Sequence, residues 1–106
     1  MYKRQVGNEG VLILDLADKS NPEFVGAVDT RYSHDVYVRD SILYSSEIFA
    51  GIFSMYDIRD RANPVLINSA ETSFNFSHNA WLSDDGNYLF TTDELPNAYV
   101  LSLIHI

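Results

Sequence analysis

The sequence predicts an all-β protein and, within that class, a fragment of a β-propeller. Strand-like apolar and aromatic runs recur along the chain, and two sequence units return after 42 to 44 residues. Residues 15–22 (DLADKSNP) return as residues 57–64 (DIRDRANP), and residues 33–36 (SHDV) return as residues 77–80 (SHNA). Strand-rich repeats of this length are typical of propeller blades.

Short runs with the composition of β-strands follow one another, and turn residues separate them. In chain order the predicted strands span residues 11–14, 24–28, 35–38, 42–46, 52–56, 65–68, 80–82 and 88–92, and residues 98–100 begin a further one. The last complete pair flanks Asp85-Gly86, which supplies the positive backbone angle that a tight turn needs. Strands that are apolar on both faces suit sheets stacked against other sheets.

The repeat divides the chain at His34 and His78. Residues 34–76 form one complete four-stranded blade, with strands at 35–38, 42–47, 52–57 and 65–70. Residues 8–33 supply the end of the preceding blade, and residues 77–100 supply the start of the next. Because a propeller closes with about four to eight blades, this piece leaves sheet faces and edges exposed. We therefore expect the isolated chain to be unstable or to associate with itself.

The two ends of the chain resemble the remnants of a sequencing adapter. One set of codons for residues 101–105, ctg tct ctt ata cac, is the reverse complement of gtg tat aag aga cag, which encodes residues 1–5 when gtg is a start codon. An adapter joined to both ends of a DNA fragment would produce this relationship. Residues 1–5 and 101–106 are therefore excluded from the fold prediction, which leaves residues 6–100 as the partial propeller.

Composition and charge narrow the classes of function. The formal charge is −8, and without Lys3 and Arg4 only 5 basic residues face 15 acidic ones. Such a surface repels phosphate backbones and anionic lipid, which disfavours nucleic-acid and membrane-surface roles. The chain has no cysteine, so disulfides and thiolate metal sites are excluded. No stretch is long and apolar enough to span a membrane.

The repeated Asp…Asn-Pro element is interpreted as a turn. Its first Asp ends a strand, where the carboxylate accepts from nearby backbone amides, and the residue before proline is extended and leads into the next strand. Calcium binding by these acids is the alternative, but the alternating ligands, central Gly and closing Glu of a calcium loop are absent. The structural repeat residues are Asp15, Asn21, Pro22, Asp57, Asn63, Pro64, Asp85 and Gly86.

His34 and His78 are the residues most suggestive of chemistry. Each follows a loop and opens the innermost strand of its blade, near one mouth of the central channel. Several such imidazoles on the axis would make a Zn, Cu or Fe site. Glu47 and the pair Asp93-Glu94 end the second strand of successive blades at the same face, where acids would act as ligands or as partners of the imidazoles. The predicted metal set is His34, His78, Glu47 and Asp93.

A structural role is the alternative for both histidines. Each imidazole would then hydrogen-bond within its own blade, and the need to pair buried polar groups favours this role. A serine hydrolase is disfavoured, because Ser33, His34 and Asp35 are consecutive and strand neighbours point to opposite faces. No catalytic residue is predicted. Most aromatic residues are expected to fill the space between blades, whereas Phe49, Phe74 and Phe76 lie in loops and are candidates for a binding face.

The hairpin SHNAWLSDDGNYLFTTDE at residues 77–94 resembles the LVIVP-repeat proteins, in particular the choice-of-anchor B family. The start at residues 34–36 and the run GIFSMYDI at residues 51–58, followed by NPVL, match as well, so that the resemblance covers residues 8–100. It implies a bacterial propeller that is secreted or held at the cell surface by a C-terminal anchor. Asn79 departs from Asp35 of the preceding unit, which weakens any role that needs a charge there.

Three functions follow from these observations. The leading hypothesis is a non-enzymatic extracellular scaffold that binds a protein or a glycan through loops on one face. The alternative is a metal-binding protein or metal-dependent enzyme with a histidine ring at the channel mouth. A purely structural surface module is the third. The propeller fold alone does not decide among them, because one fold supports many activities.

Overall fold

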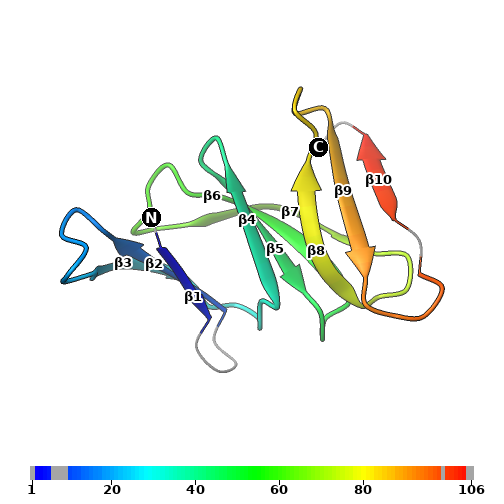
Figure 1. Cartoon of the computed structure of the whole chain (residues 1–106), viewed down its shortest axis with the longest axis horizontal. Coiled ribbons are helices and arrows are strands. Elements are labelled where there is room, and N and C mark those ends of the chain that lie inside the picture. Colours follow the sequence, from blue (N-terminus) through cyan, green and yellow to red (C-terminus); the bar gives the residue numbers. More distant parts are fainter. Residues whose placement is uncertain (1, 6–9, 99, 105–106) are drawn as a thin grey trace.

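The computed structural model describes residues 2–5, 10–98 and 100–104, which form three antiparallel β-sheets (Figure 1). The N-terminal sheet contains β1 (Tyr2–Gln5), β2 (Val11–Asp15) and β3 (Glu23–Val28). The central sheet contains β4 (Asp35–Arg39), β5 (Ile42–Glu47), β6 (Ile52–Asp57) and β7 (Val65–Glu71). The C-terminal sheet contains β8 (Ser77–Leu82), β9 (Tyr88–Asp93) and β10 (Leu101–Ile104). The prediction of an all-β protein is confirmed.

Within these described ranges no helix is long and apolar enough to cross a membrane. The central sheet is a meander in the order β4-β5-β6-β7, and its strands begin where the sequence predicts them. A two-residue turn at Asp40 and Ser41, both with positive φ, joins β4 to β5. The register of β6 shifts between Met55 and Tyr56, and that of β2 shifts between Ile13 and Leu14, 42 residues earlier. The bulge therefore recurs with the sequence repeat.

Strands β1 and β10 lie in the segments that the fold prediction excluded. β1 pairs with β2, and β10 pairs with β9, so each covers a strand that would otherwise form a sheet edge. An edge strand offers unpaired backbone groups to any extended segment that reaches it. The strand predicted to begin at residues 98–100 includes Tyr99, which lies outside the described residues; β10 begins at Leu101.

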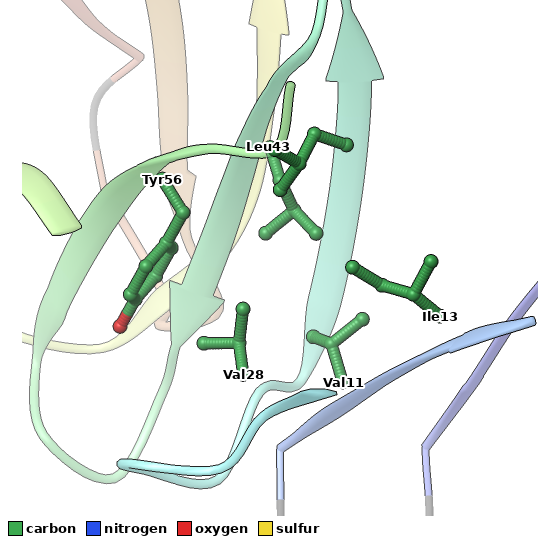
Figure 2. Packing of buried hydrophobic residues seen from close by; sticks show 6 residues of the cluster. Val11, Ile13, Val28, Leu43 and Tyr56 are labelled. Atoms are coloured by element: carbon green, nitrogen blue, oxygen red, sulfur yellow. The ribbon is translucent and has the colours of Figure 1, made fainter. Parts of the chain in front are cut away.

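Side chains from alternate strand positions join the sheets into a stack. The first cluster unites the N-terminal and central sheets, and none of its members is more than 4% exposed (Figure 2). Burial of one aliphatic side chain contributes about 1.5–3 kcal/mol, so this interface is a main source of stability. The cluster consists of Val11, Ile13, Val28, Leu43, Tyr56 and Ile58.

A second cluster lies on the opposite face of the central sheet, against the C-terminal sheet. Its buried members are Tyr44, Phe53, Met55, Ala80, Leu82 and Leu89. Leu43 and its neighbour Tyr44 belong to different clusters, because successive strand residues point to opposite faces. Arg39 reinforces this interface by donating to the carbonyl oxygens of Ser83 and Asp84, each at 2.6 Å.

The two Asp…Asn-Pro units form equivalent turns. Asp15 Oδ1 accepts from the Ala17 amide at 2.8 Å, and Asp57 Oδ1 accepts from the Arg59 amide at 2.9 Å. The Arg59 side chain bonded to Asp57 lowers the pKa of that carboxyl group. In the β8–β9 turn, Gly86 has a φ of +76°, as the Asp-Gly pair predicts. These carboxylates are occupied by turn hydrogen bonds, which fits their interpretation as structural residues.

Candidate metal centre

Four loops meet at one end of the central and C-terminal sheets, at the lower side of Figure 1. Two of them precede β4 and β8, and the other two follow β5 and β9, as antiparallel order requires. His34 lies just before β4, His78 is the second residue of β8, and Glu94 directly follows β9. We call these three residues the histidine cluster.

The two imidazoles converge on one carboxylate. His34 Nε2 lies 3.8 Å from Glu94 Oε2, and His78 Nε2 lies 3.9 Å from the same oxygen. The centroids of the two imidazole rings are 4.9 Å apart. One ligand atom from each residue falls within 4.8 Å of the others. Because His34 belongs to the central sheet and the other two to the C-terminal sheet, the cluster bridges a sheet interface.

Backbone contacts explain why these side chains meet. The His34 amide donates to the Ser46 carbonyl at 2.7 Å, which holds His34 beside the end of β5. The Glu94 amide donates to the Phe76 carbonyl at 3.1 Å, which holds Glu94 beside the segment that enters β8. The register of β8 shifts between Ser77 and Asn79, and such a bulge re-aims the side chain within it. His78 lies in that bulge.

The cluster suits a borderline metal ion such as Zn²⁺. Bond lengths of about 2.0–2.1 Å around a tetrahedral ion place ligand atoms about 3.4 Å apart. The two imidazole nitrogens, 3.8 and 3.9 Å from Glu94 Oε2, need to approach that oxygen by roughly 0.5 Å, and ligand atoms at the 4.8 Å limit of the cluster need to approach by roughly 1.4 Å. The side chains can move that far, because those of His34, His78 and Glu94 are 31%, 40% and 57% exposed. Three protein ligands also leave a coordination position open to water or a ligand.

The structure does not bring Glu47 into the histidine cluster. Glu47 is 1% exposed, and its carboxylate oxygens accept from Arg31 Nη1 and Tyr56 Oη, each at 3.2 Å. The Tyr56 hydroxyl also lies 3.0 Å from Thr30 Oγ1. Burial raises the pKa of Tyr56, so this hydroxyl remains a donor to Glu47. Glu47 therefore ties the loop before His34 to the central sheet.

Asp93 also lies outside the cluster, although it directly precedes Glu94. Asp93 is 8% exposed and accepts from three donors of residues 72–76. These donors are Thr72 Oγ1, the Phe74 amide at 2.7 Å and the Phe76 amide at 3.2 Å. The acid that meets the imidazoles is thus Glu94. Strand alternation accounts for this, because Leu89, Thr91 and Asp93 share the buried face of β9 and the next residue points away from that face.

The predicted loop aromatics lie at the same end of the sheets. Phe49 is 77% exposed, and its ring centroid lies 5.0 Å from that of Tyr32. Phe74 is 43% exposed, and Phe76 is half-buried. Phe49 is therefore the most exposed of the three candidates for a binding face.

No protein-family model matches the chain, and neither a curated protein nor a solved structure matches it. The resemblance to the LVIVP-repeat proteins stays a prediction that rests on the quoted motifs. Function is therefore argued from the geometry and chemistry of the site itself.

Proposed function

We propose that this protein binds a divalent transition-metal ion through His34, His78 and Glu94, with Zn²⁺ as the reference ion. The observation that carries the proposal is the convergence of two imidazoles, from equivalent positions of two sheets, on one exposed carboxylate oxygen. Two nitrogen ligands and one oxygen ligand suit Zn²⁺ and related ions, and poorly suit Ca²⁺ or Mg²⁺. The absence of cysteine from the sequence argues against a softer thiolate site.

A β-propeller architecture is part of the same proposal. The three sheets are consecutive blades of a β-propeller, the central one complete, and the histidine cluster lies at the channel mouth where two blades meet. The stacked order of the sheets, the recurring bulge and the recurring Asp…Asn-Pro turns support this reading. In a larger propeller of the LVIVP-repeat type, the site would lie on the outside of the cell or at its surface.

A structural role for the histidines makes different demands. It requires that each imidazole hydrogen-bond within its own sheet, as buried polar groups do. The His34 imidazole faces Glu94 and His78, which belong to the neighbouring sheet, and both imidazoles are partly exposed. His78 and Glu94 belong to the same sheet, so the contacts of His34 are the ones that distinguish the two roles. This arrangement supports a ligand role over a structural one.

The test is isothermal titration of the full chain with ZnCl₂ after chelator treatment. The expected result is one Zn²⁺ per chain, with binding lost in His34→Ala and Glu94→Gln while both variants remain folded by circular dichroism. Glu71→Gln is a matched control, because Glu71 is exposed and lies outside the cluster. Wild-type protein that takes up no Zn²⁺ would refute the proposal, and unfolded variants would support the structural role instead.

A second candidate function is recognition of a protein or glycan by the loop aromatics. The exposed Phe49 ring, which lies against Tyr32 with the two ring planes tilted by 30°, favours it, because such a ring pair offers apolar surface to a ligand. A glycan array probed with wild type and Phe49→Ser tests this function. Signals that the variant loses at unchanged stability support it, and identical profiles contradict it.

A further inference from the structure

We propose that Asp93 is a positioning residue that sets the geometry of the metal ligands, and that Glu47 has the same role in the preceding sheet. The inference rests on the metal site proposed above. Both acids are the last residues of equivalent strands, β9 and β5, and both are buried. Each carboxylate accepts hydrogen bonds from the segment that precedes one of the two histidines, so both acids would act through the segments that they hold.

Asp93 fixes the segment that leads into His78. Its carboxylate accepts from Thr72 Oγ1 and from the amides of Phe74 and Phe76, and hydrogen bonds to a charged acceptor are the strong ones. Phe76 precedes His78 by two residues, and its carbonyl oxygen accepts from the Glu94 amide at 3.1 Å. One buried carboxylate therefore holds the backbone beside two of the three ligands.

Glu47 holds the corresponding segment before His34. Its two oxygens accept from Arg31 Nη1 and Tyr56 Oη, and the Tyr56 hydroxyl in turn lies 3.0 Å from Thr30 Oγ1. The Glu47 carboxylate supports the segment before one ligand, His34, and it does so through side-chain hydrogen bonds. The Asp93 carboxylate accepts from backbone amides of the segment that lies beside two ligands, His78 and Glu94. We therefore expect the larger effect on metal binding from Asp93.

Ligand geometry makes such support necessary. The three ligand side chains are partly exposed, and their ligand atoms must come closer together to hold a metal ion, so displacements of their backbones change the affinity. Substitution of residues that orient metal ligands lowers affinity typically by about 10–100-fold. A buried carboxylate without contact to the metal is thus expected to control its binding.

The experiment compares Zn²⁺ affinity and the visible absorption of bound Co²⁺ in wild type and Asp93→Asn. The variant keeps the size of Asp93 but, in either orientation of its amide, turns an NH₂ donor toward the backbone N–H of Phe74 or Phe76. The expected result is one bound metal, about 10–100-fold weaker, with a changed Co²⁺ spectrum. Asp84→Asn makes the same charge change on an exposed turn at the other end of the sheet, and both readouts should stay as in wild type.

Two further variants keep the outcomes distinct. Thr72→Val removes one donor and leaves the Asp93 charge in place, so it replaces Asp93→Asn if that variant fails to fold. The Thr72 variant should lose less Zn²⁺ affinity than Asp93→Asn, and its Co²⁺ spectrum should change in the same direction. Glu94→Gln should abolish binding, as a direct ligand does. If wild type binds no metal, the proposed function fails. If wild type binds and the folded Asp93 or Thr72 variant matches its affinity and spectrum, the positioning role alone is overturned.

Discussion

Burial separates the acidic residues near the histidine cluster into two kinds. Glu47 and Asp93 are 1% and 8% exposed and have their oxygens occupied by hydrogen bonds, whereas the Glu94 side chain is 57% exposed. A buried carboxylate that loses its donors pays a large desolvation penalty, so Glu47 and Asp93 are held in place. An exposed carboxylate exchanges partners freely, which leaves Glu94 the acid that can accept a metal ion.

Tyr56 gives a prediction at the same scale. Burial is the main cause that raises its pKa above 10.0, and the charge of Glu47 adds to it, against the hydrogen bond with Thr30. Since the folded-state pKa lies above the unfolded one, the stability due to the neutral hydroxyl is complete below pH 10.0 and is lost as pH rises through the folded pKa.

Denaturant unfolding at about pH 8 and about pH 11 measures this effect. Wild type should lose more stability over that interval than Tyr56→Phe, which has no hydroxyl to ionise. The variant should still lose some, because burial also raises the pKa of Tyr44. Equal losses in the two proteins would show that the Tyr56 hydroxyl is not protected in the folded state.

Strand alternation explains how far the site was predictable. The sequence identified both histidines, because they repeat with an offset of 44 residues and precede strands. It indicated Asp93 and not Glu94 as the ligand, because both acids stand at the end of the strand and their residue types do not show which one points inward. In the structure Leu89, Thr91 and Asp93 alternate on the buried face of β9, so Glu94 is the acid that points away from it. The convergence on a single oxygen depends on the β8 bulge, which no residue pattern revealed.

Among the elements, the loops beside the histidine cluster pack so closely that one position requires glycine. Gly51, in the β5–β6 loop, has a φ of +71°, and a Cβ there would lie 2.6 Å from the Asn75 carbonyl oxygen. Its amide donates to the Glu47 carbonyl at 3.0 Å. The β5–β6 loop therefore depends on the same segment, residues 72–76, that Asp93 organises.

Two glycine substitutions separate backbone strain from close approach. Gly86→Ala introduces strain alone, because Gly86 has a φ of +76° and its nearest neighbour would be 4.0 Å from the added Cβ. Gly51→Ala introduces the same strain and a clash. We expect chemical denaturation to show a loss of about 1 kcal/mol for Gly86→Ala and a clearly larger loss for Gly51→Ala. Equal losses of stability in the two variants would mean that the β5–β6 loop does not contact residues 72–76.

The strands themselves were largely predictable. Apolar and aromatic runs between turn signals placed the starts of the central-sheet strands correctly. β5 and β6 are buried on both faces, as their composition suggests, whereas β7 is mostly exposed. β1 and β10 were not predicted, since their segments were excluded as adapter remnants. Their pairing follows from the free edges of β2 and β9, which is a property of the sheets and not of the local sequence.

For the whole molecule, the proposed metal ion would link two sheets. Contacts between the central and C-terminal sheets include one apolar cluster, the Tyr37–Trp81 ring pair, the Arg39 hydrogen bonds and the histidine cluster. A ligand that binds only the folded state stabilises it, by about 2.7 kcal/mol at a concentration of 100 times its Kd. Metal binding and sheet packing are therefore expected to support each other.

Thermal unfolding with and without excess Zn²⁺ measures this coupling. The melting temperature of wild type should rise with Zn²⁺, and that of His78→Ala should not. Acidification should cancel the rise, because protons compete with the metal for the imidazole nitrogens. A Zn²⁺-dependent rise that persists in His78→Ala would place the metal elsewhere on the chain.

The most direct test of the account is an NMR titration that follows the imidazole nitrogens of His34 and His78 as Zn²⁺ is added. If the two rings share one metal ion, their Nε2 resonances shift together and saturate at one equivalent of metal. Unchanged resonances at saturating Zn²⁺, or a shift in only one of the two rings, would contradict a metal centre shared between the two sheets.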